Sequence, residues 1–199
     1  FKTKKGRLIV SGIDQSESAL WTAPLVVNPL DGFDLMHGRT RVYRSFDGGD
    51  LWYPSSPYFR NEISALAFSP VEYGQQWAGT SAGDLWLSTN DGESWQPIKQ
   101  MNLTNRFISS IQCSRKDGAT AWITYGQYGA PNVWKTTNLG ETWTSAWGNM
   151  PDIPVNGLAV HPEDENILFI ATDIGVFATF DGGIHWMPYG KGLPRTVVT

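Results

Sequence analysis

Short apolar runs separated by turn residues recur along the whole chain. In the first full unit, which begins near Trp21, the runs predict strands around residues 25–27, 34–38 and 41–44. The second and fourth units repeat this arrangement at residues 66–69, 76–80, 84–87, 158–161, 167–171 and 175–178. Proline follows the first run of each of these units, and the ladder donor that proline lacks suits the end of a strand. The pattern predicts short strands joined by tight turns.

Each third strand runs into an eight-residue phrase that occurs four times. The phrase reads hydroxyl, any residue, Asp or Asn, any residue, Gly, two further residues and Trp. Its fixed positions are Ser45, Asp47, Gly49, Trp52, Ser88, Asn90, Gly92, Trp95, Thr136, Asn138, Gly140, Trp143, Thr179, Asp181, Gly183 and Trp186. The tryptophans follow one another at intervals of 43, 48 and 43 residues. A period of roughly 20 to 50 residues indicates a repeat architecture.

The residue types in the phrase predict a self-contained turn. An Asp or Asn side chain can accept hydrogen bonds from backbone N–H groups just ahead of it, and a Ser or Thr hydroxyl can do the same. The glycine at the fifth position supplies a positive φ that a side chain would resist. The tryptophan can then fold back onto the hairpin and bury its ring. We therefore expect each phrase to close a β-hairpin corner.

The phrase resembles the Asp-box, also called the bacterial neuraminidase repeat, of the form Ser/Thr-x-Asp-x-Gly-x-Thr-Trp. Asn90 and Asn138 stand in place of the Asp, and Leu51 and His185 in place of the Thr. Sialidases, sortilin-type receptors, xyloglucan-active glycoside hydrolases and photosystem assembly factors carry this repeat and resemble one another as β-propellers. The resemblance covers nearly the whole chain and implies an all-β fold, a β-propeller of four-stranded antiparallel blades. In those families the box is a structural corner on the face away from the active site.

The chain is expected to hold about four blades and parts of others. The third unit is longer because its middle turn carries an insertion at Tyr125–Pro131. An open ring would leave exposed edges, so these residues are expected either to belong to a larger propeller or to close a composite fifth blade from the two terminal strands. The expected divisions are a partial blade at 1–20, blades at 21–60, 61–105, 106–152 and 153–194, and the start of another at 195–199.

Composition narrows the class of protein. Ten Trp, nine Phe and seven Tyr give an aromatic content of 13%, while only 17% of residues are charged, which fits packed sheets. The net charge of −4 argues against a general nucleic-acid or anionic-membrane surface. The sequence has no run of 18 apolar residues, so no membrane-spanning helix is expected.

The sequence predicts no metal site and no cofactor. The single cysteine, Cys113, cannot form an internal disulfide and is expected to be a small buried residue. His37, His161 and His185 fall on different positions of the repeat and cannot form one metal site. There is no Ser-His-Asp spacing, phosphate loop or dinucleotide fingerprint.

Ligand contacts are expected at the blade end opposite the eight-residue turn. In a four-stranded antiparallel blade, this end carries the loop between the second and third strands and the connection to the next blade. Its arginines could bind an acidic group, and the aromatic residues of the insertion, with a nearby tryptophan, offer flat faces for a sugar or peptide. The ligand-binding candidates are Arg39, Arg60, Arg106, Tyr125, Tyr128, Trp147 and Asp173.

Two carboxylates at this end, Asp84 and Asp173, are the candidates for catalysis. Glycoside hydrolysis generally uses two carboxyl groups about 5 to 9.5 Å apart, but these two belong to blades two apart and no spacing argument unites them. Thr172-Asp173-Ile174-Gly175 resembles a stretch that can carry a catalytic carboxylate in xyloglucan-active hydrolases. Counting back six residues from each phrase hydroxyl gives Asp173 the counterparts Arg39, Ala82 and Ala130, so the chemistry at this position varies between units.

The sequence thus favours a non-catalytic propeller module that binds or scaffolds a glycan or protein ligand. Such a module is expected outside the cytoplasm, whether secreted, at the cell surface or in the periplasm, with further blades supplied by the same or a partner chain. The alternative is a fragment of an Asp-box glycoside hydrolase of sialidase-like or xyloglucanase-like type. A sialidase-like site would need an arginine cluster, yet the Phe-Arg-Ile-Pro phrase associated with that family is absent.

Overall fold

A computed structural model describes residues 8–99, 103–190 and 196–198, and within them the protein consists of sixteen strands in four sheets. The first sheet contains β1 (Leu25–Asn28), β2 (Asp31–Gly38), β3 (Val42–Ser45) and β4 (Tyr53–Pro54). The second contains β5 (Ile63–Phe68), β6 (Gln76–Thr80), β7 (Leu85–Ser88) and β8 (Gln96–Pro97). The third contains β9 (Ile108–Cys113), β10 (Ala121–Tyr125), β11 (Val133–Thr136) and β12 (Thr144–Ser145). The fourth contains β13 (Val155–Val160), β14 (Leu168–Thr172), β15 (Gly175–Thr179) and β16 (Trp186–Pro188).

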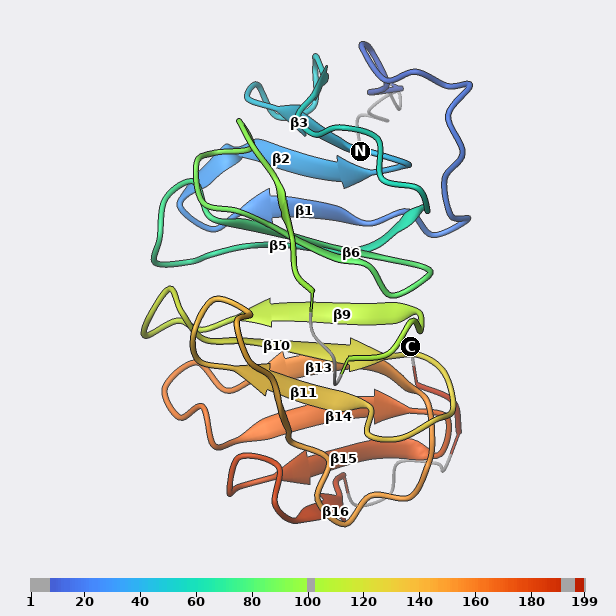
Figure 1. The fold of residues 1–199 in the computed structure, drawn as a ribbon, viewed down its shortest axis with the longest axis vertical. Coiled ribbons are helices and arrows are strands. Elements are labelled where there is room, and N and C mark those ends of the chain that lie inside the picture. The colour runs from blue at the N-terminus through green and yellow to red at the C-terminus, as the bar shows by residue number, and fades with distance from the viewer. Residues whose placement is uncertain (1–7, 100–102, 191–195, 199) are drawn as a thin grey trace, which may run out of the picture.

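The sheets lie side by side along the long axis of the molecule (Figure 1). Within each sheet the strands pair antiparallel in chain order. Consecutive sheets meet through their first strands, because β1 contacts β5, β5 contacts β9, and β9 contacts β13. The prediction of an all-β protein built from four-stranded antiparallel units is confirmed, and the described residues contain no helix.

The hydrophobic core lies between consecutive sheets. In each of the first three sheets, one residue of the second strand and one of the third strand point at the sheet that follows, where they meet the first strand and the phrase tryptophan of that sheet. In the first three sheets these pairs are Met36 and Val42, Trp77 and Leu85, and Trp122 and Val133, none of them more than 2% exposed. Burial of aliphatic and aromatic area of this kind is the main term that stabilises stacked sheets.

The eight-residue phrase forms the turn that its residue types predicted. In the first copy Gly49 N donates to Ser45 Oγ at 2.8 Å, and Ser45 Oγ donates to Asp47 Oδ1 at 2.7 Å. Leu51 N donates to the same Asp47 oxygen at 3.0 Å. The glycine-to-hydroxyl bond recurs in the other copies as Gly92 N to Ser88 Oγ at 2.9 Å, Gly140 N to Thr136 Oγ1 at 3.0 Å and Gly183 N to Thr179 Oγ1 at 3.0 Å.

The phrase also contains a strained position that the sequence did not indicate. The fifth-position glycines have the expected positive φ, for example 99° at Gly49 and 98° at Gly183. The fourth position is left-handed as well, and in the second and third copies it holds side chains, at Asp91 (φ 63°) and Leu139 (φ 56°). A left-handed conformation costs a residue with a side chain roughly 1–2 kcal/mol, so these two turns store strain.

The phrase tryptophans bury their rings as expected, but each one also reaches beyond its own hairpin. Trp95 Nε1 donates to Ser55 O at 2.8 Å, and Trp186 Nε1 donates to Ala146 O at 3.1 Å. Each acceptor lies just after the fourth strand of the preceding sheet. The tryptophan therefore fastens one sheet to the sheet before it.

We call the stack of four sheets the fan. Because the strands within each sheet are antiparallel, the fan has two different ends. We call the end that carries the second-to-third-strand loops and the connections between sheets the loop end, and the end that carries the eight-residue turns the turn end. The first strands begin at the loop end, which lies on the right in Figure 1.

Loop length changes the residue that corresponds to Asp173. Strand pairing aligns Gly38–Val42 with Gly79–Leu85, Thr124–Val133 and Ala171–Val176. By this register the counterparts of Asp173 are Thr40, Ser81 and Gly126. Counting back from the phrase hydroxyl was wrong here because it crosses loops of unequal length.

Candidate functional site

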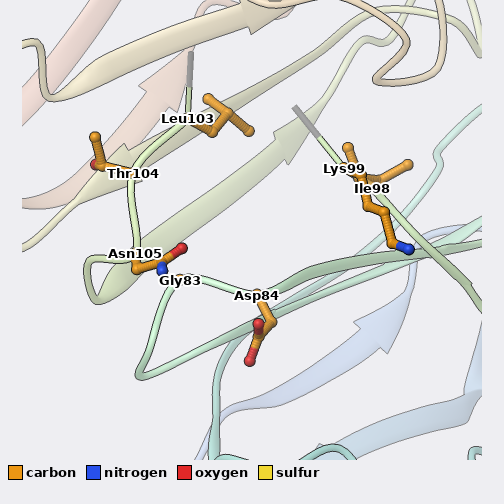
Figure 2. Close-up of a pocket in the computed structure, with 7 residues that line it drawn as sticks. All are labelled: Gly83, Asp84, Ile98, Lys99, Leu103, Thr104 and Asn105. Atoms are coloured by element: carbon orange, nitrogen blue, oxygen red, sulfur yellow. The ribbon is translucent and has the colours of Figure 1, made fainter. Parts of the chain in front are cut away.

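A cavity of about 350 Å³ opens at the loop end between the second and third sheets. Three segments line it: the β6–β7 loop, the stretch after β8, and the connection that leads to β9 (Figure 2). The lining residues are Gly83, Asp84, Ile98, Lys99, Leu103, Thr104 and Asn105. The site therefore combines one carboxylate, one amine, one hydroxyl and one amide with two aliphatic side chains.

Gly83 brings the β6–β7 loop against the connection. Its φ is +92°, and an added Cβ would lie 2.5 Å from Arg106 N and 2.8 Å from Asn105 Cα. A side chain at this position would be strained in its own backbone and would also collide with the connection. The wall of the cavity depends on glycine at residue 83.

Asp84 is held in place by its neighbours. Its Oδ2 accepts hydrogen bonds from Asn61 Nδ2 at 2.9 Å and from Thr80 Oγ1 at 3.2 Å, while its backbone N donates to Thr80 Oγ1 at 3.0 Å. The Asp84 side chain is nonetheless exposed, as are Lys99, Thr104 and Asn105. Asp84 can therefore accept a hydrogen bond from a ligand hydroxyl or amine from a preorganised position.

Exposed aromatic rings surround this end of the fan. Trp21, which precedes β1, is 101% exposed, and Tyr58, in the connection from β4 to β5, is 60% exposed. The Arg41 guanidinium lies 3.4 Å from the centre of the Tyr58 ring. Tyr128, in the β10–β11 loop, is 65% exposed. The sequence prediction included Tyr128 and missed Trp21 and Tyr58, although both lie in segments that join predicted strands at this end.

Arg106 and Asp152 fix the loop that the insertion forms. Arg106 Nη2 donates to Pro131 O at 2.9 Å, and Arg106 Nη1 donates to Asn132 Oδ1. Asp152 Oδ1 accepts from Gly129 N at 2.7 Å. Burial lowers the pKa of the Arg106 guanidinium. The structure thus places this predicted ligand contact in the support of the loop that presents Tyr128.

The other predicted aromatic contacts lie in the core. Tyr125 is fully buried and packs between the second and third sheets, and burial raises the pKa of its hydroxyl. Trp147 is 5% exposed and packs between the third and fourth sheets. Neither ring presents a face at the surface of this structure.

The cysteine that sequence analysis expected to be buried, Cys113, is half-buried, with its pKa raised to about 12 by desolvation.

The two remaining arginine candidates have different surroundings. Arg39 Nη2 donates to the backbone carbonyls of Glu17 and Gln15, so it ties the N-terminal segment to the first sheet. Arg60 is exposed in the connection that precedes β5. Arg39 and Arg106 share no hydrogen-bond partner in the described residues, so the structure gives no sign of an arginine cluster that includes Arg60.

The two candidate catalytic carboxylates occupy separate sheets. Asp173 Oδ1 accepts from Asn156 Nδ2 at 3.0 Å in the fourth sheet, whereas Asp84 lies in the second, and the third sheet stands between them. Asp84 is the one carboxylate among the residues that line the described cavity.

Within residues 8–99, 103–190 and 196–198 there is no cluster of His, Cys, Asp and Glu suited to a metal ion. Nor does this part of the chain form a helix with the length and apolarity that crossing a membrane requires.

Comparison with solved structures identifies the fold. The chain is similar to an ancestral GH74 enzyme, with a TM-score of 0.73 and 18% identity over 92% of this chain and 25% of that one. It is also similar to the GH74 xyloglucanase from Xanthomonas campestris, with a TM-score of 0.65 and 21% identity over 84% of this chain and 29% of that one. YCF48 bound to D1 peptide matches with a TM-score of 0.50 and 13% identity over 86% of this chain and 87% of YCF48.

These similarities show that the four sheets are blades of a β-propeller. The chain spans about a quarter of the length of the ancestral GH74 enzyme. No protein-family model matches the chain, and no curated protein is significantly similar to it in sequence.

Proposed function

We propose that this chain is a non-catalytic β-propeller module that binds a glycan through its loop end. The observation that carries the proposal is the cavity around Asp84, which offers hydrogen-bonding side chains beside aliphatic ones. Exposed rings at the same end, Trp21, Tyr58 and Tyr128, supply flat apolar faces. Sugar recognition needs this combination, because one face of a pyranose ring is apolar while its rim carries hydroxyl groups. We propose that such a module works outside the cytoplasm.

We also infer that the four eight-residue turns are Asp-boxes. The hydroxyl-to-glycine and Asp-to-backbone hydrogen bonds recur in each copy, and the copies with Asn90 and Asn138 keep the same acceptor geometry. Asn replaces Asp without loss because the side-chain oxygen, not the charge, accepts the backbone bonds. The turns lie at the end opposite the proposed ligand site, which agrees with a structural role.

The alternative is that the chain is part of an Asp-box glycoside hydrolase. The similarity in fold to GH74 enzymes, one of them a xyloglucanase, favours it. The arrangement of carboxylates favours the binding module, because hydrolysis generally needs two carboxyl groups about 5 to 9.5 Å apart across one bond. Asp84 is the one acid in the lining of the described cavity, and Asp173 lies two blades away.

The test uses soluble xyloglucan oligosaccharides as the probe, with titration calorimetry for binding and a reducing-end assay for hydrolysis. We expect binding without release of reducing ends. Asp84→Asn and Trp21→Ala should each weaken the affinity about five- to tenfold, the loss expected for one hydrogen bond or one stacking contact. Asp173→Asn, the matched control in the fourth blade, should leave the affinity unchanged.

Two other outcomes would refute the proposal. Reducing-end release that disappears in both Asp84→Asn and Asp173→Asn would show a hydrolase. Binding of extended peptides with the same dependence on Asp84, and no binding of any oligosaccharide, would show a protein-binding module, the kind of ligand that YCF48 carries in its solved complex.

A further inference from the structure

The outer face of the fourth sheet carries an apolar groove of about 320 Å³. Ile174, Gly175, Val176, Phe177, Pro188 and Tyr189 line it. Ile174 is 44% exposed and Tyr189 is 49% exposed. In the first three sheets the corresponding face is covered by the next sheet.

The partly exposed residues of this face occupy the strand positions that form the hydrophobic core between the other sheets. By strand register, Phe169 and Val176 are the counterparts of Trp122 and Val133 in the third sheet. Trp122 and Val133 are fully buried, whereas Phe169 and Val176 are partly exposed. The fourth sheet therefore has the same chemistry at the same positions, an aromatic ring beside a valine, but nothing in the described residues covers it.

A side-chain hydrogen bond fixes where the third and fourth sheets begin. Ser64 Oγ donates to Ile108 O at 2.7 Å, and Ser109 Oγ donates to Val155 O. The donor is the second residue of one first strand, and the acceptor is the first residue of the next. Asn156 Nδ2 donates to Val198 O at 3.0 Å, so Val198 is the next acceptor in this series.

A backbone bond gives the same register for Val198. Ile63 N, at the start of the second sheet, donates to Arg39 O at 2.7 Å. Val198 N donates to Thr172 O at 3.1 Å, and Thr172 is the counterpart of Arg39 in the fourth sheet. Val198 thus occupies the position of Ile63, Ile108 and Val155, the residues that begin the first strands. Sequence analysis expected residues 195–199 to begin a new unit; of these, 195 and 199 lie outside the described residues.

The acceptor for the next tryptophan is in place as well. Ser55, Ala146 and Tyr189 each donate a backbone N–H to the third strand of their own sheet, at 2.8, 3.0 and 2.9 Å. The carbonyls of Ser55 and Ala146 receive Nε1 of the following tryptophan. The Tyr189 carbonyl holds the corresponding position on the open face.

We propose that the outer face of the fourth sheet is the seat of a further four-stranded blade whose first strand begins at Val198. That blade buries Phe169 and Val176 with its first strand and donates a tryptophan Nε1 to Tyr189 O. Continuity with the three existing sheet-to-sheet interfaces selects this occupant over a second copy of the chain, because the hydrogen bonds at Val198 already set the register of a following strand.

The test compares three proteins: the chain itself, a fusion in which residues 156–190 follow Val198 directly, and the same fusion with one glycine inserted after Val198. The copied blade is the one that packs on Trp122 and Val133, so its packing surface matches a face with an aromatic residue and a valine. The glycine moves the register by one residue, which turns every side chain of the strand to the opposite face.

Urea unfolding of the direct fusion should give one transition whose m-value is about a fifth larger than that of the parent, because m scales with the surface buried by folding. The glycine-shifted fusion should keep the m-value of the parent. Val176→Glu supplies a second measurement: it should shift the urea midpoint of the direct fusion several times more than that of the parent, where this side chain is partly exposed.

Two results would overturn the proposal. Equal m-values and equal sensitivity to Val176→Glu in the two fusions would show that register at Val198 does not direct a blade onto this face. Concentration-dependent dimerisation of the parent that Val176→Glu abolishes would show that a second copy is the occupant.

Discussion

Replacing Arg44 should cost more stability than any other single change at a charged residue of the fan. Arg44 is 1% exposed and lies between the first two sheets. Its Nε and Nη2 donate to the two carboxylate oxygens of Asp34, both at 2.7 Å. Its Nη1 reaches Asp91 of the next sheet, 2.6 Å from Oδ1 and 2.8 Å from the backbone carbonyl.

The expected magnitude follows from what Arg44→Met leaves behind. Asp34 is 2% exposed and would keep only the hydrogen bond from Asn28 Nδ2, at 2.7 Å. A buried charge that loses its partner costs about 3–5 kcal/mol. A domain of this size has a free energy of unfolding of roughly 5–15 kcal/mol, so the variant should lose a large fraction of it. With an m-value of about 2–3 kcal/mol/M, the urea midpoint should fall by roughly 1–2 M.

A double-mutant cycle measured by urea unfolding isolates the pair. Arg44→Met combined with Asp34→Leu removes both charges, and it should recover most of the loss because no unpaired charge remains. Asp91→Asn is the matched control: this partner is 36% exposed, so its loss should cost no more than about 1 kcal/mol. A loss below about 1 kcal/mol for Arg44→Met, or a double variant as unstable as the sum of the single ones, would refute the reasoning.

Three further predictions concern the turns and the cavity wall. Leu139→Gly should raise the unfolding free energy by about 0.5–1 kcal/mol in urea titration, because it relieves a left-handed φ of 56° at a position where Gly48 and Gly182 stand in other copies; a loss of stability would contradict the strain. Gly83→Ala should lower the unfolding free energy by about 1–3 kcal/mol and weaken oligosaccharide binding, since the added Cβ would meet Arg106 N at 2.5 Å. Unchanged binding would show that the β6–β7 loop is not part of the ligand site. Backbone and side-chain hydrogen bonds from His185 and Thr179 depress the pKa of Asp181 below its ordinary value of 3.8. The carboxylate therefore contributes fully to folding stability above pH 3.8, and this contribution is lost as the pH falls below that value. Asp181→Asn should therefore flatten the dependence of Tm on pH below about pH 4, and an unchanged slope would exclude this carboxylate.

The turn end could be predicted from the sequence in detail. A hydroxyl, an Asp or Asn, a glycine and a tryptophan at fixed spacing interact within eight residues, so the sequence alone specifies most of their contacts. What it did not specify were Asp91 and Leu139 in left-handed conformations, because a positive φ is uncommon for any residue with a side chain, even though Asp adopts it more often than Leu. The Trp95 and Trp186 hydrogen bonds to the preceding sheet also escaped it, since their acceptors are about 40 residues away.

The loop end could be predicted only as a region. Asp84 was found because it sits at the start of a third strand, and the structure places it in a cavity. Tyr125 and Trp147 were assigned to the surface from their neighbours in the chain, yet long-range packing buries both. Trp21 and Tyr58 went unnoticed because an exposed ring and a buried ring look alike in a sequence. Whether a ring is buried depends on the sheet that packs against it, and the sequence of a single repeat unit does not specify that packing.

The two ends of the fan differ in what their residues determine. Contacts of the strands and turns determine the fold, while the loops at the other end are free to vary. The contacts that carry the period, such as Ser64 to Ile108 O and Asn156 to Val198 O, use the first strands and leave the β6–β7 and β10–β11 loops free to differ. Loops of different length then place different side chains at one rim without disturbing the stack. A GH74 xyloglucanase and a peptide-bound YCF48 can accordingly share this architecture. Under the proposed function, the residues around Asp84 select the ligand, and the turns that define the fold do not.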